Sequence, residues 1–417
     1  MNTPKTLNAE ILSTGDEVLL GDITDTNSSF LCGTLKELGI RTRRITAVGD
    51  EEGEIAETLK AIAGRADVCL VTGGLGPTRD DLTASAAARA AGVALEMRQD
   101  ALDFMKVYFK RRGFELTPEN EKQALLPATA TILENNCGTA PGFSMEMDGC
   151  AFYFMPGVPS EMRAMVAAHV VPALKARLGL ERDIPIERLT VFGLGESKVG
   201  ALLEGFESEF SGIRLGFRAD FPVIEVKLVQ SRGDASDMAA AKAWVVERLE
   251  NKVVSLEGRS LAAEVGHLLA QRGETLAVAE SCTGGLIANW LTNVSGSSDY
   301  FLLSAVTYAN EAKEGVLGVK HQTLLDNGAV HETTALEMAQ GTRKQGGSDW
   351  GISTTGIAGP TGGTPDKPVG TVCIGISGPG MDRAKRYVFK FEDRYRHKLI
   401  FAATALEALR RELVTEN

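Results

Sequence analysis

Residues 295–313 of the sequence, SGSSDYFLLSAVTYANEAK, combine small hydroxyls, a phenol and an amine, and contain no histidine. Ser298, Tyr308 and Lys313 are the members of this set that could carry out chemistry. An uncharged lysine can take the proton from a serine hydroxyl, and a nearby tyrosine can orient or relay that proton. From residue types alone, a turn-forming serine, a tyrosine at the edge of a core and a surface lysine remain the favoured interpretation.

The local pattern nevertheless gives Lys313 an unusual setting. The apolar segment 300–308 predicts a buried strand with Tyr308 at its carboxyl end, and a helix beginning at Asn310 places Lys313 in its first turn. A positive charge is disfavoured at that end of a helix. Together with partial burial, this position would lower the pKa of the lysine.

A second set of candidate residues lies in the glycine-rich turn of VTGGLGPTRDDLT, residues 71–83. Gly73, Gly74 and Gly76 allow a ligand to approach the backbone closely. Backbone amides at such a turn can hold phosphate, and the acidic pair Asp80 and Asp81 can hold a hard cation against it. A tight turn in which Asp80 caps a helix accounts for the same residues equally well.

A similar turn occurs in VAESCTGGLIANWL, residues 278–291. Ser281 and Thr283 offer hydroxyls, and Gly284 and Gly285 precede a helix, so the segment resembles an anion site. A serine-capped helix with no ligand is the alternative. Cys282 is a weaker candidate, because the pattern assigns it no histidine partner.

Two further segments add candidate ligand contacts. Residues 353–370 form a long loop rich in glycine and proline, and loops of this length often have a function. Thr355, Gly356 and Gly359 are its candidate substrate contacts. Arg394 can pair with a phosphate through two parallel hydrogen bonds of its guanidinium, or form a salt bridge with Asp393 or Glu392.

The surrounding pattern predicts the elements that carry these residues. Apolar strand segments alternate with amphipathic helices in residues 9–92, an order that implies a parallel sheet covered on both faces. We expect an α/β protein of three parts: two α/β domains with mainly parallel sheets, residues 1–180 and 258–417, joined by a small α+β module, residues 181–257. In parallel sheets, ligands bind beyond the carboxyl ends of the strands, where both turns lie.

Composition narrows the function further. The chain has 417 residues and a net charge of −11, which argues against general nucleic-acid binding. Its six cysteines form no C-x-x-C pair, and its five histidines are scattered, so we expect free thiols, no zinc site and a cytoplasmic location. No segment is predicted to be a signal peptide or a membrane span.

Several separated motifs resemble the CinA family, the competence/damage-inducible proteins. In the first domain these are TGDEVLLGDITDTNSSFL, VTGGLGPTRDDLT, NCGTAPGF and MPGVPSEM. The resemblance implies a domain similar to molybdopterin-binding domains, acting as a metal-dependent pyrophosphatase on ADP-ribose. Our candidate ligands for its divalent metal ion, whose identity the sequence does not give, are Asp16, Asp80, Asp81 and Glu161.

The last domain carries AESCTGG, SGSSDYF, VTYANEAK, TTGIAGPTGGT and KPVGTV, which resemble the nicotinamide-nucleotide amidase domain of the same family. The resemblance implies hydrolysis of nicotinamide mononucleotide to nicotinate mononucleotide and ammonia, without a cofactor. It also favours Ser298, Tyr308 and Lys313 as catalytic residues, with the choice between Ser297 and Ser298 resting on spacing.

The middle module is similar to a KH-type fold and is expected to be a spacer or a dimer contact, in a homodimer that binds small nucleotides and no membrane. Two other interpretations stay open. The first domain can be a molybdopterin-binding module of cofactor biosynthesis, or the chain can be a non-enzymatic partner of the DNA-uptake machinery.

Overall fold

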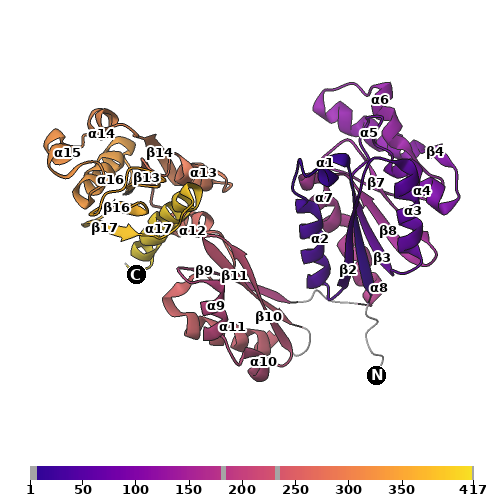
Figure 1. Ribbon diagram of the computed structural model, residues 1–417, viewed down its shortest axis with the longest axis horizontal. Coiled ribbons are helices and arrows are strands. Elements are labelled where there is room, and N and C mark those ends of the chain that lie inside the picture. The colour runs from indigo at the N-terminus through magenta and orange to yellow at the C-terminus, as the bar shows by residue number, and fades with distance from the viewer. Residues whose placement is uncertain (1–6, 180–184, 231–234, 416–417) are drawn as a thin grey trace. The chain divides into compact units, whose positions relative to one another are not determined.

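A computed structural model describes residues 7–179, 185–230 and 235–415 of the chain (Figure 1). The chain divides into two compact units, Met1–Ile184 and Pro185–Asn417. The predicted border at residues 180 and 181 lies outside the described residues. The predicted border at residues 257 and 258 stays a prediction, and it falls between the last strand of one sheet and the first helix of the next.

The first unit is built on a six-stranded sheet of order β2-β1-β3-β8-β7-β6. Its strands are β1 (Asn8–Thr14), β2 (Arg41–Val48), β3 (Val68–Thr72), β6 (Thr131–Leu133), β7 (Gly142–Met147) and β8 (Cys150–Met155). The first four in the order pair in parallel, whereas β7 is antiparallel to both of its neighbours. The prediction of a mainly parallel sheet is confirmed.

Helices cover both faces of this sheet (Figure 1). They are α1 (Asp16–Leu19), α2 (Thr26–Glu37), α3 (Glu52–Ala63), α4 (Thr83–Ala91), α5 (Gln99–Arg112), α6 (Pro118–Glu121), α7 (Pro159–Met165) and α8 (Val171–Leu178). Two short strands, β4 (Leu95–Met97) and β5 (Leu125–Pro127), pair beside them. Successive residues of β1 point to opposite faces of the sheet and pack in different hydrophobic cores. Leu12 packs with α3 and α4, and Ile11 packs with α2 and α7.

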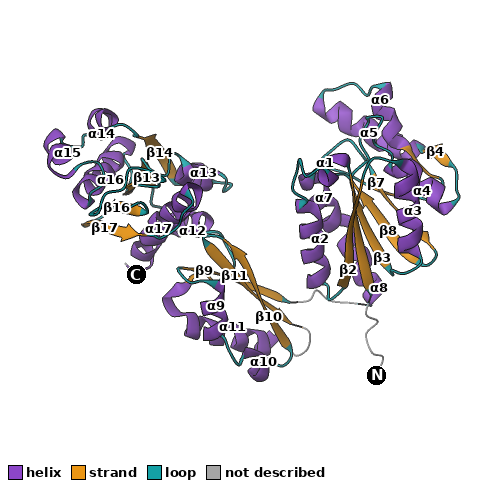
Figure 2. Cartoon of the chain, viewed as in Figure 1, coloured by secondary structure: helices purple, strands orange, loops and turns teal. Residues whose placement is uncertain are grey.

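The second unit begins with an antiparallel sheet of order β10-β11-β9-β12. Its strands are β9 (Ile186–Phe192), β10 (Ile213–Asp220), β11 (Val223–Gln230) and β12 (Val253–Ser255). Figure 2 shows α9 (Glu196–Leu202), α10 (Phe206–Glu209) and α11 (Ala235–Leu249) on one face of it. Alternate residues of β11 are buried, as the alternating sequence predicts.

The rest of this unit is a five-stranded sheet of order β14-β13-β15-β16-β17. Its strands are β13 (Leu276–Glu280), β14 (Phe301–Val306), β15 (Trp350–Gly356), β16 (Thr371–Gly378) and β17 (Met381–Val388). The strands β14, β13 and β15 pair in parallel, whereas β16 is antiparallel to both of its neighbours, β15 and β17. Its helices are α12 (Leu261–Arg272), α13 (Leu286–Thr292), α14 (Asn310–Leu317), α15 (His321–Asn327), α16 (Glu332–Gly346) and α17 (Arg394–Thr415).

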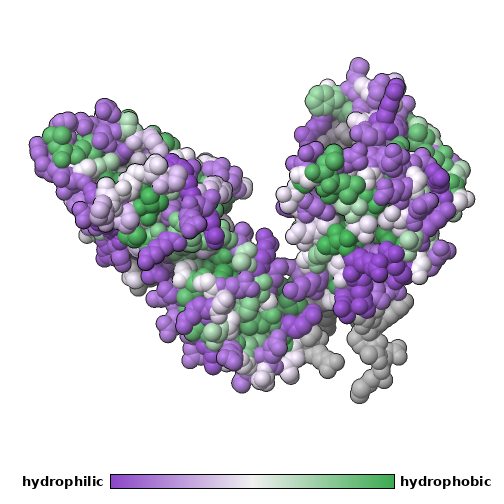
Figure 3. Space-filling view, viewed as in Figure 1, coloured by the Kyte–Doolittle hydropathy of each residue, from purple (hydrophilic) through white to green (hydrophobic). Residues whose placement is uncertain are grey.

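Two layers of helices enclose this second sheet. Val278 of β13 packs with α12 and α17 in one core, and its neighbour Ala279 packs with Met338 of α16 in the other. Hydrophilic residues surround small apolar patches on the visible face of each unit (Figure 3). Within the described part of the chain, no helix is both long and apolar enough to span a membrane.

Candidate active site

The amine of Lys313 lies inside the second unit rather than on its surface. Only 1% of the residue is exposed. Its Nζ donates to the backbone carbonyls of Thr307 at 2.9 Å and Tyr308 at 3.0 Å. It also lies 3.2 Å from the Oγ of Ser281, which directly follows β13. Three oxygen atoms therefore surround a buried nitrogen.

This setting favours the uncharged form of the lysine. Burial lowers the pKa of Lys313 below its ordinary value, and the negative charges of the Cys282 thiolate form and of Glu311 act weakly in the opposite direction. An uncharged amine has two N–H bonds, which the two carbonyls can accept. Its lone pair then points toward Ser281, so the geometry suits removal of the serine proton.

Ser298 does not take part in this arrangement, so the prediction that it pairs with Lys313 is wrong. Ser298 lies in the short helical turn Ser297–Asp299, before β14 begins, whereas Lys313 follows the end of β14. Six residues of strand separate the two positions by roughly 20 Å. Parallel pairing of Glu280 with Val306 instead brings Ser281 beside Thr307.

The side chain of Tyr308 also differs from its predicted role. Its ring is 63% exposed, and its hydroxyl accepts a hydrogen bond from Nη2 of Arg394 at 3.2 Å. Lys313 contacts the carbonyl of Tyr308, not its phenol. The structure thus places the phenol at the rim of the site and does not support its use as a proton relay.

The start of α13, which was predicted to bind an anion, is already occupied by the carboxylate of Glu280. Glu280 is fully buried, and its carboxylate accepts hydrogen bonds from the backbone amides of Gly285, Ile287 and Ala288 at 3.0, 3.2 and 2.9 Å. A carboxylate at the start of α13 satisfies amides that would otherwise lack partners. Sequence reasoning missed Glu280, because a strand-end glutamate gives no sign of where its side chain points.

Closer to the serine, two backbone amides remain available. Among the described residues, no hydrogen-bond acceptor is found for the amides of Thr283 and Gly284. Gly284 adopts a left-handed backbone with φ of 61°, which favours glycine. These amides belong to residues two and three positions after Ser281 and could stabilise an oxyanion formed there.

Most of the other predicted substrate contacts support the frame of the site. The hydroxyl of Thr283 lies 2.7 Å from that of Thr354, and the hydroxyl of Thr355 donates to the carbonyl of Ala329 at 2.7 Å. Both threonines are buried. Gly356 is required by close packing, because a Cβ there would lie 2.5 Å from the carbonyl oxygen of Thr371 and 3.2 Å from the sulfur of Cys282. Burial raises the pKa of that thiol to about 12, which disfavours Cys282 as a nucleophile.

Two cationic side chains at the start of α17 face this site. Arg394 donates to the carbonyl of Gly359 at 2.5 Å as well as to the phenol of Tyr308. One turn later, the Nζ of Lys398 lies 3.6 Å from the position of a Cβ on Gly284. Lys398 was not predicted, although its spacing of four residues from Arg394 places both on one helix face.

In the first unit, the loops after β1 and β3 meet as the sequence predicts. The hydroxyls of Thr14 and Thr83 lie 3.0 Å apart, and a Cβ on Gly73 would lie 2.1 Å from the carbonyl oxygen of Thr14. Gly74 is equally restricted, since its Cβ would lie 2.1 Å from Thr83 Oγ1. Gly76 packs against the carboxylate of Asp81. The glycines are thus needed for contact between loops.

The four acids predicted to hold a metal ion do not form one group. Asp81 accepts hydrogen bonds from the amide and hydroxyl of Thr78 at 2.8 and 2.5 Å. Glu161 accepts from the amide of Asn135 at 2.6 Å. Within the described ranges, no three His, Cys, Asp or Glu side chains have a metal-binding arrangement. The structure therefore does not bring the four predicted metal ligands together as one site.

Asp16 instead lies beside an acid that sequence reasoning missed. The backbone amides of Asp16 and Asp50 each donate to the carboxylate of the other, at 3.1 and 3.2 Å. Burial raises the pKa of Asp50, and the charges of Asp16, Glu17 and Asp80 raise it further, against the effect of the Asp16 amide. Asp80 does not cap α4, which begins after Leu82 without a side-chain cap.

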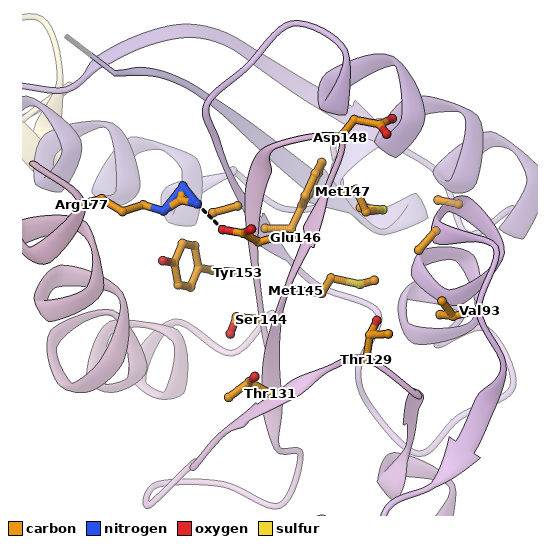
Figure 4. A pocket seen from close by; sticks show the side chains of 14 residues that line it. Val93, Thr129, Thr131, Ser144, Met145, Glu146, Met147, Asp148, Tyr153 and Arg177 are labelled. Atoms are coloured by element: carbon orange, nitrogen blue, oxygen red, sulfur yellow. Dashed lines mark hydrogen bonds and ion pairs between the residues drawn. The ribbon is translucent and has the colours of Figure 1, made fainter. Parts of the chain in front are cut away.

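A cavity of about 580 Å³ in the first unit contains none of the predicted residues (Figure 4). It lies at the β7–β8 turn, away from the carboxyl ends of β1 and β3. Glu146 and Arg177 point toward each other across its rim and form an ion pair.

Comparisons with known proteins cover nearly the whole chain. The model of the CinA C-terminal domain matches residues 258–413, and that of a probable molybdopterin binding domain matches residues 10–176. A CinA-like protein of Desulforapulum autotrophicum is 50% identical over 416 residues, which cover 98% of each chain. One of Geobacter sulfurreducens is 44% identical over 408 residues, covering 97% of this chain and 98% of that protein.

Solved structures match only parts of the chain. CinA of unknown function from Thermoplasma acidophilum is 33% identical, with a TM-score of 0.38, and the match covers 42% of this chain and 98% of that one. The competence damage-inducible protein A of Klebsiella pneumoniae is 36% identical, with a TM-score of 0.36, over 38% of this chain and 97% of that one.

The buried carboxylate predicts a stability effect. Replacing Glu280 by Gln leaves at least one of the three amides facing an N–H group, so we expect the free energy of unfolding to fall by about 1–3 kcal/mol. Thermal and denaturant unfolding measure this change. Glu311→Gln, which removes the same charge from an exposed position, is the control; an equal loss in both variants would contradict the role given to Glu280.

Proposed function

The chain belongs to the CinA-like family, and we propose that its second unit hydrolyses the carboxamide of nicotinamide mononucleotide through Ser281 and Lys313. The observation that carries this proposal is the buried Lys313 Nζ, which lies 3.2 Å from Ser281 Oγ and donates to two carbonyls. Burial in this arrangement lowers the pKa of the amine and so favours its uncharged form, and among the described residues Ser281 is the only serine to which it is hydrogen-bonded.

The reaction follows from this geometry. Lys313 takes the proton of Ser281 as its Oγ bonds to the carboxamide carbon, and the carbonyl oxygen becomes an oxyanion. The free amides of Thr283 and Gly284 stabilise that oxyanion, an effect worth about 3 kcal/mol for one such donor. Lys313 then gives its proton to the leaving nitrogen. The C–N bond breaks, ammonia departs, and the acyl group remains as an ester on Ser281.

Hydrolysis of that ester repeats the same steps with water. Lys313 removes a proton from the water, whose oxygen attacks the ester carbon, and the proton returns to Ser281 as the carboxylic acid leaves. One lysine therefore serves both halves of the reaction, and its two carbonyl partners hold it in place throughout.

The rim of the site supports a nucleotide as substrate. Arg394 and Lys398 are cations on one face of α17, and the guanidinium of Arg394 can bind phosphate with two parallel hydrogen bonds. The start of α13 cannot serve this purpose, because Glu280 occupies it. The exposed ring of Tyr308 lies at the same rim and offers a surface for the pyridine ring.

A matched pair of serine variants tests the nucleophile. Ser281→Ala should reduce ammonia release from nicotinamide mononucleotide by at least about 1,000-fold, because among the described residues only Ser281 places a hydroxyl within hydrogen-bonding distance of Lys313. Ser298→Ala should retain the rate of the parent protein within about twofold. The reverse pattern in an ammonia assay would restore Ser298 and reject the proposed site.

The pH dependence tests the base. Only the uncharged amine can accept a proton, so activity should rise with pH until Lys313 is deprotonated. Because burial lowers its pKa, kcat/KM should level off at a pH below the ordinary lysine pKa of about 10.4.

Lys313→Arg provides the companion variant. It retains a hydrogen-bonding cation that cannot lose its proton, so activity should vanish at every pH. Normal activity in this variant would exclude lysine as the base.

One observation favours a second activity, in the first unit. Asn27 donates to Thr72 Oγ1 at 3.0 Å and to the carbonyl of Gly157 at 2.7 Å, while its Oδ1 is buried and has no partner among the described residues. A cavity of about 90 Å³ beside it is lined by Thr14 and Gly73. A ligand hydroxyl would satisfy this oxygen, as in a ribose.

The nearby acids Asp16 and Asp50 suit such a site if it cleaves ADP-ribose, the activity that family resemblance suggests. The corrected acid set does not fit a metal ion as predicted, so we derive no step through one. Binding of molybdopterin without turnover is the competing function, consistent with the domain model that matches residues 10–176.

Acid variants distinguish these functions of the first unit. Asp50→Asn should lower the formation of AMP and ribose 5-phosphate from ADP-ribose by at least about tenfold and leave ammonia release unchanged. Asp148→Asn removes the same charge at the β7–β8 turn and should alter neither activity. Product formation is measured by chromatography with and without a chelator, and loss of both activities in Asp50→Asn would indicate misfolding instead.

A further inference from the structure

The turn between β10 and β11 belongs to the middle sheet but packs against the amidase domain. Phe221 and Val223 contact the hydrophobic core formed by α12, α17 and the five-stranded sheet. A cavity of about 460 Å³ lies at the same junction, between this turn and the first turns of α17. The middle module is therefore in contact with the helix that carries Arg394.

Three side chains make the contact specific. The rings of Phe221 and Phe391 meet edge to face, with centroids 5.3 Å apart and an angle of 85° between their planes. The guanidinium of Arg396 lies over both rings, at 4.6 Å from the centroid of Phe221 and 5.1 Å from that of Phe391. Cation–aromatic contacts of this kind hold the charged group in one orientation.

The same turn of α17 is tied to the active site on its other side. Arg394, two residues before Arg396, donates to the carbonyl of Gly359 and the phenol of Tyr308. The ring of His397 is buried and bonds through Nδ1 to the carbonyl of Ala358 at 2.9 Å. The first turn of α17 thus lies between the middle-module turn and the loop that borders the substrate.

We propose that Phe221 is a positioning residue for the amidase site: it fixes Arg396, and so the first turn of α17, in the place from which Arg394 meets the substrate phosphate. This inference rests on the proposed function for the identity of the phosphate. The middle module is then a structural part of the amidase site and not only a spacer.

Kinetics with two substrates test the inference in the full chain. Phe221→Ala should raise KM for nicotinamide mononucleotide about tenfold and change kcat by less than about twofold, because the ring contact affects binding and not Ser281. Turnover of nicotinamide riboside, which lacks the phosphate, should not change. A role limited to stability would lower both reactions in parallel, and that outcome would overturn the proposal.

Two variants and one physical measurement complete the experiment. Phe221→Trp keeps an aromatic face and should restore the low KM, and Phe217→Ala, in the same sheet but away from α17, should have no effect. Hydrogen exchange of the amides at residues 397–400 should accelerate at least about fivefold in Phe221→Ala. Unchanged exchange would reject the positioning role even if the chain proved to have no amidase activity, so failure of the two proposals can be told apart.

Discussion

The buried amine of Lys313 is the constraint on which the second unit depends. A charged ammonium is poorly solvated in such a place, and two backbone carbonyls compensate only part of the lost hydration. The carbonyls of Thr307 and Tyr308 become available because β14 ends just before them, and Ser281 becomes available because β13 ends at the paired position. The register of two parallel strands therefore brings Ser281 beside the amine of Lys313, the pair to which we assign the nucleophile and the base.

Glu280, the last residue of β13, determines which backbone amides near Ser281 are already occupied by a negative charge. Its carboxylate satisfies three amides at the start of α13, so that helix presents no open anion site to the substrate. The amides of Thr283 and Gly284, two and three residues after Ser281, have no acceptor among the described residues, so they are available for the charge that would develop only during the proposed reaction. The phosphate of the proposed nucleotide substrate is a permanent anion, so it would have to be held elsewhere, and the cations Arg394 and Lys398 of α17 are our candidates for that role.

The sequence predicted the elements well and the pairing of their ends less well. Apolar runs and capping residues located β1, β3, β13 and α12, because local pattern determines burial there. The sequence placed Lys313 in the first turn of a helix, but residue types alone favoured a surface position, whereas the structure buries it. The expected contact of Ser298 with Lys313 is absent among the described hydrogen bonds, because β14 lies between the two residues and their separation along the chain does not show this. The contacts of Asp50, Asn27 and Phe221 join segments far apart in sequence, and no local pattern encodes them.

The two units use a similar strand-end turn for opposite electrostatic purposes. In the first, Gly73 and Gly74 bring loops together around the unsatisfied oxygen of Asn27 and the paired acids Asp16 and Asp50. Such a site repels an anionic substrate unless a cation or protons offset its charge; the pKa of Asp50 is raised chiefly by burial and further by the charges of Asp16, Glu17 and Asp80. In the second unit, three backbone amides stabilise the carboxylate of Glu280, and burial lowers the pKa of Lys313, which favours its uncharged form. An uncharged amide, the substrate that we propose, needs no counter-ion at such a centre.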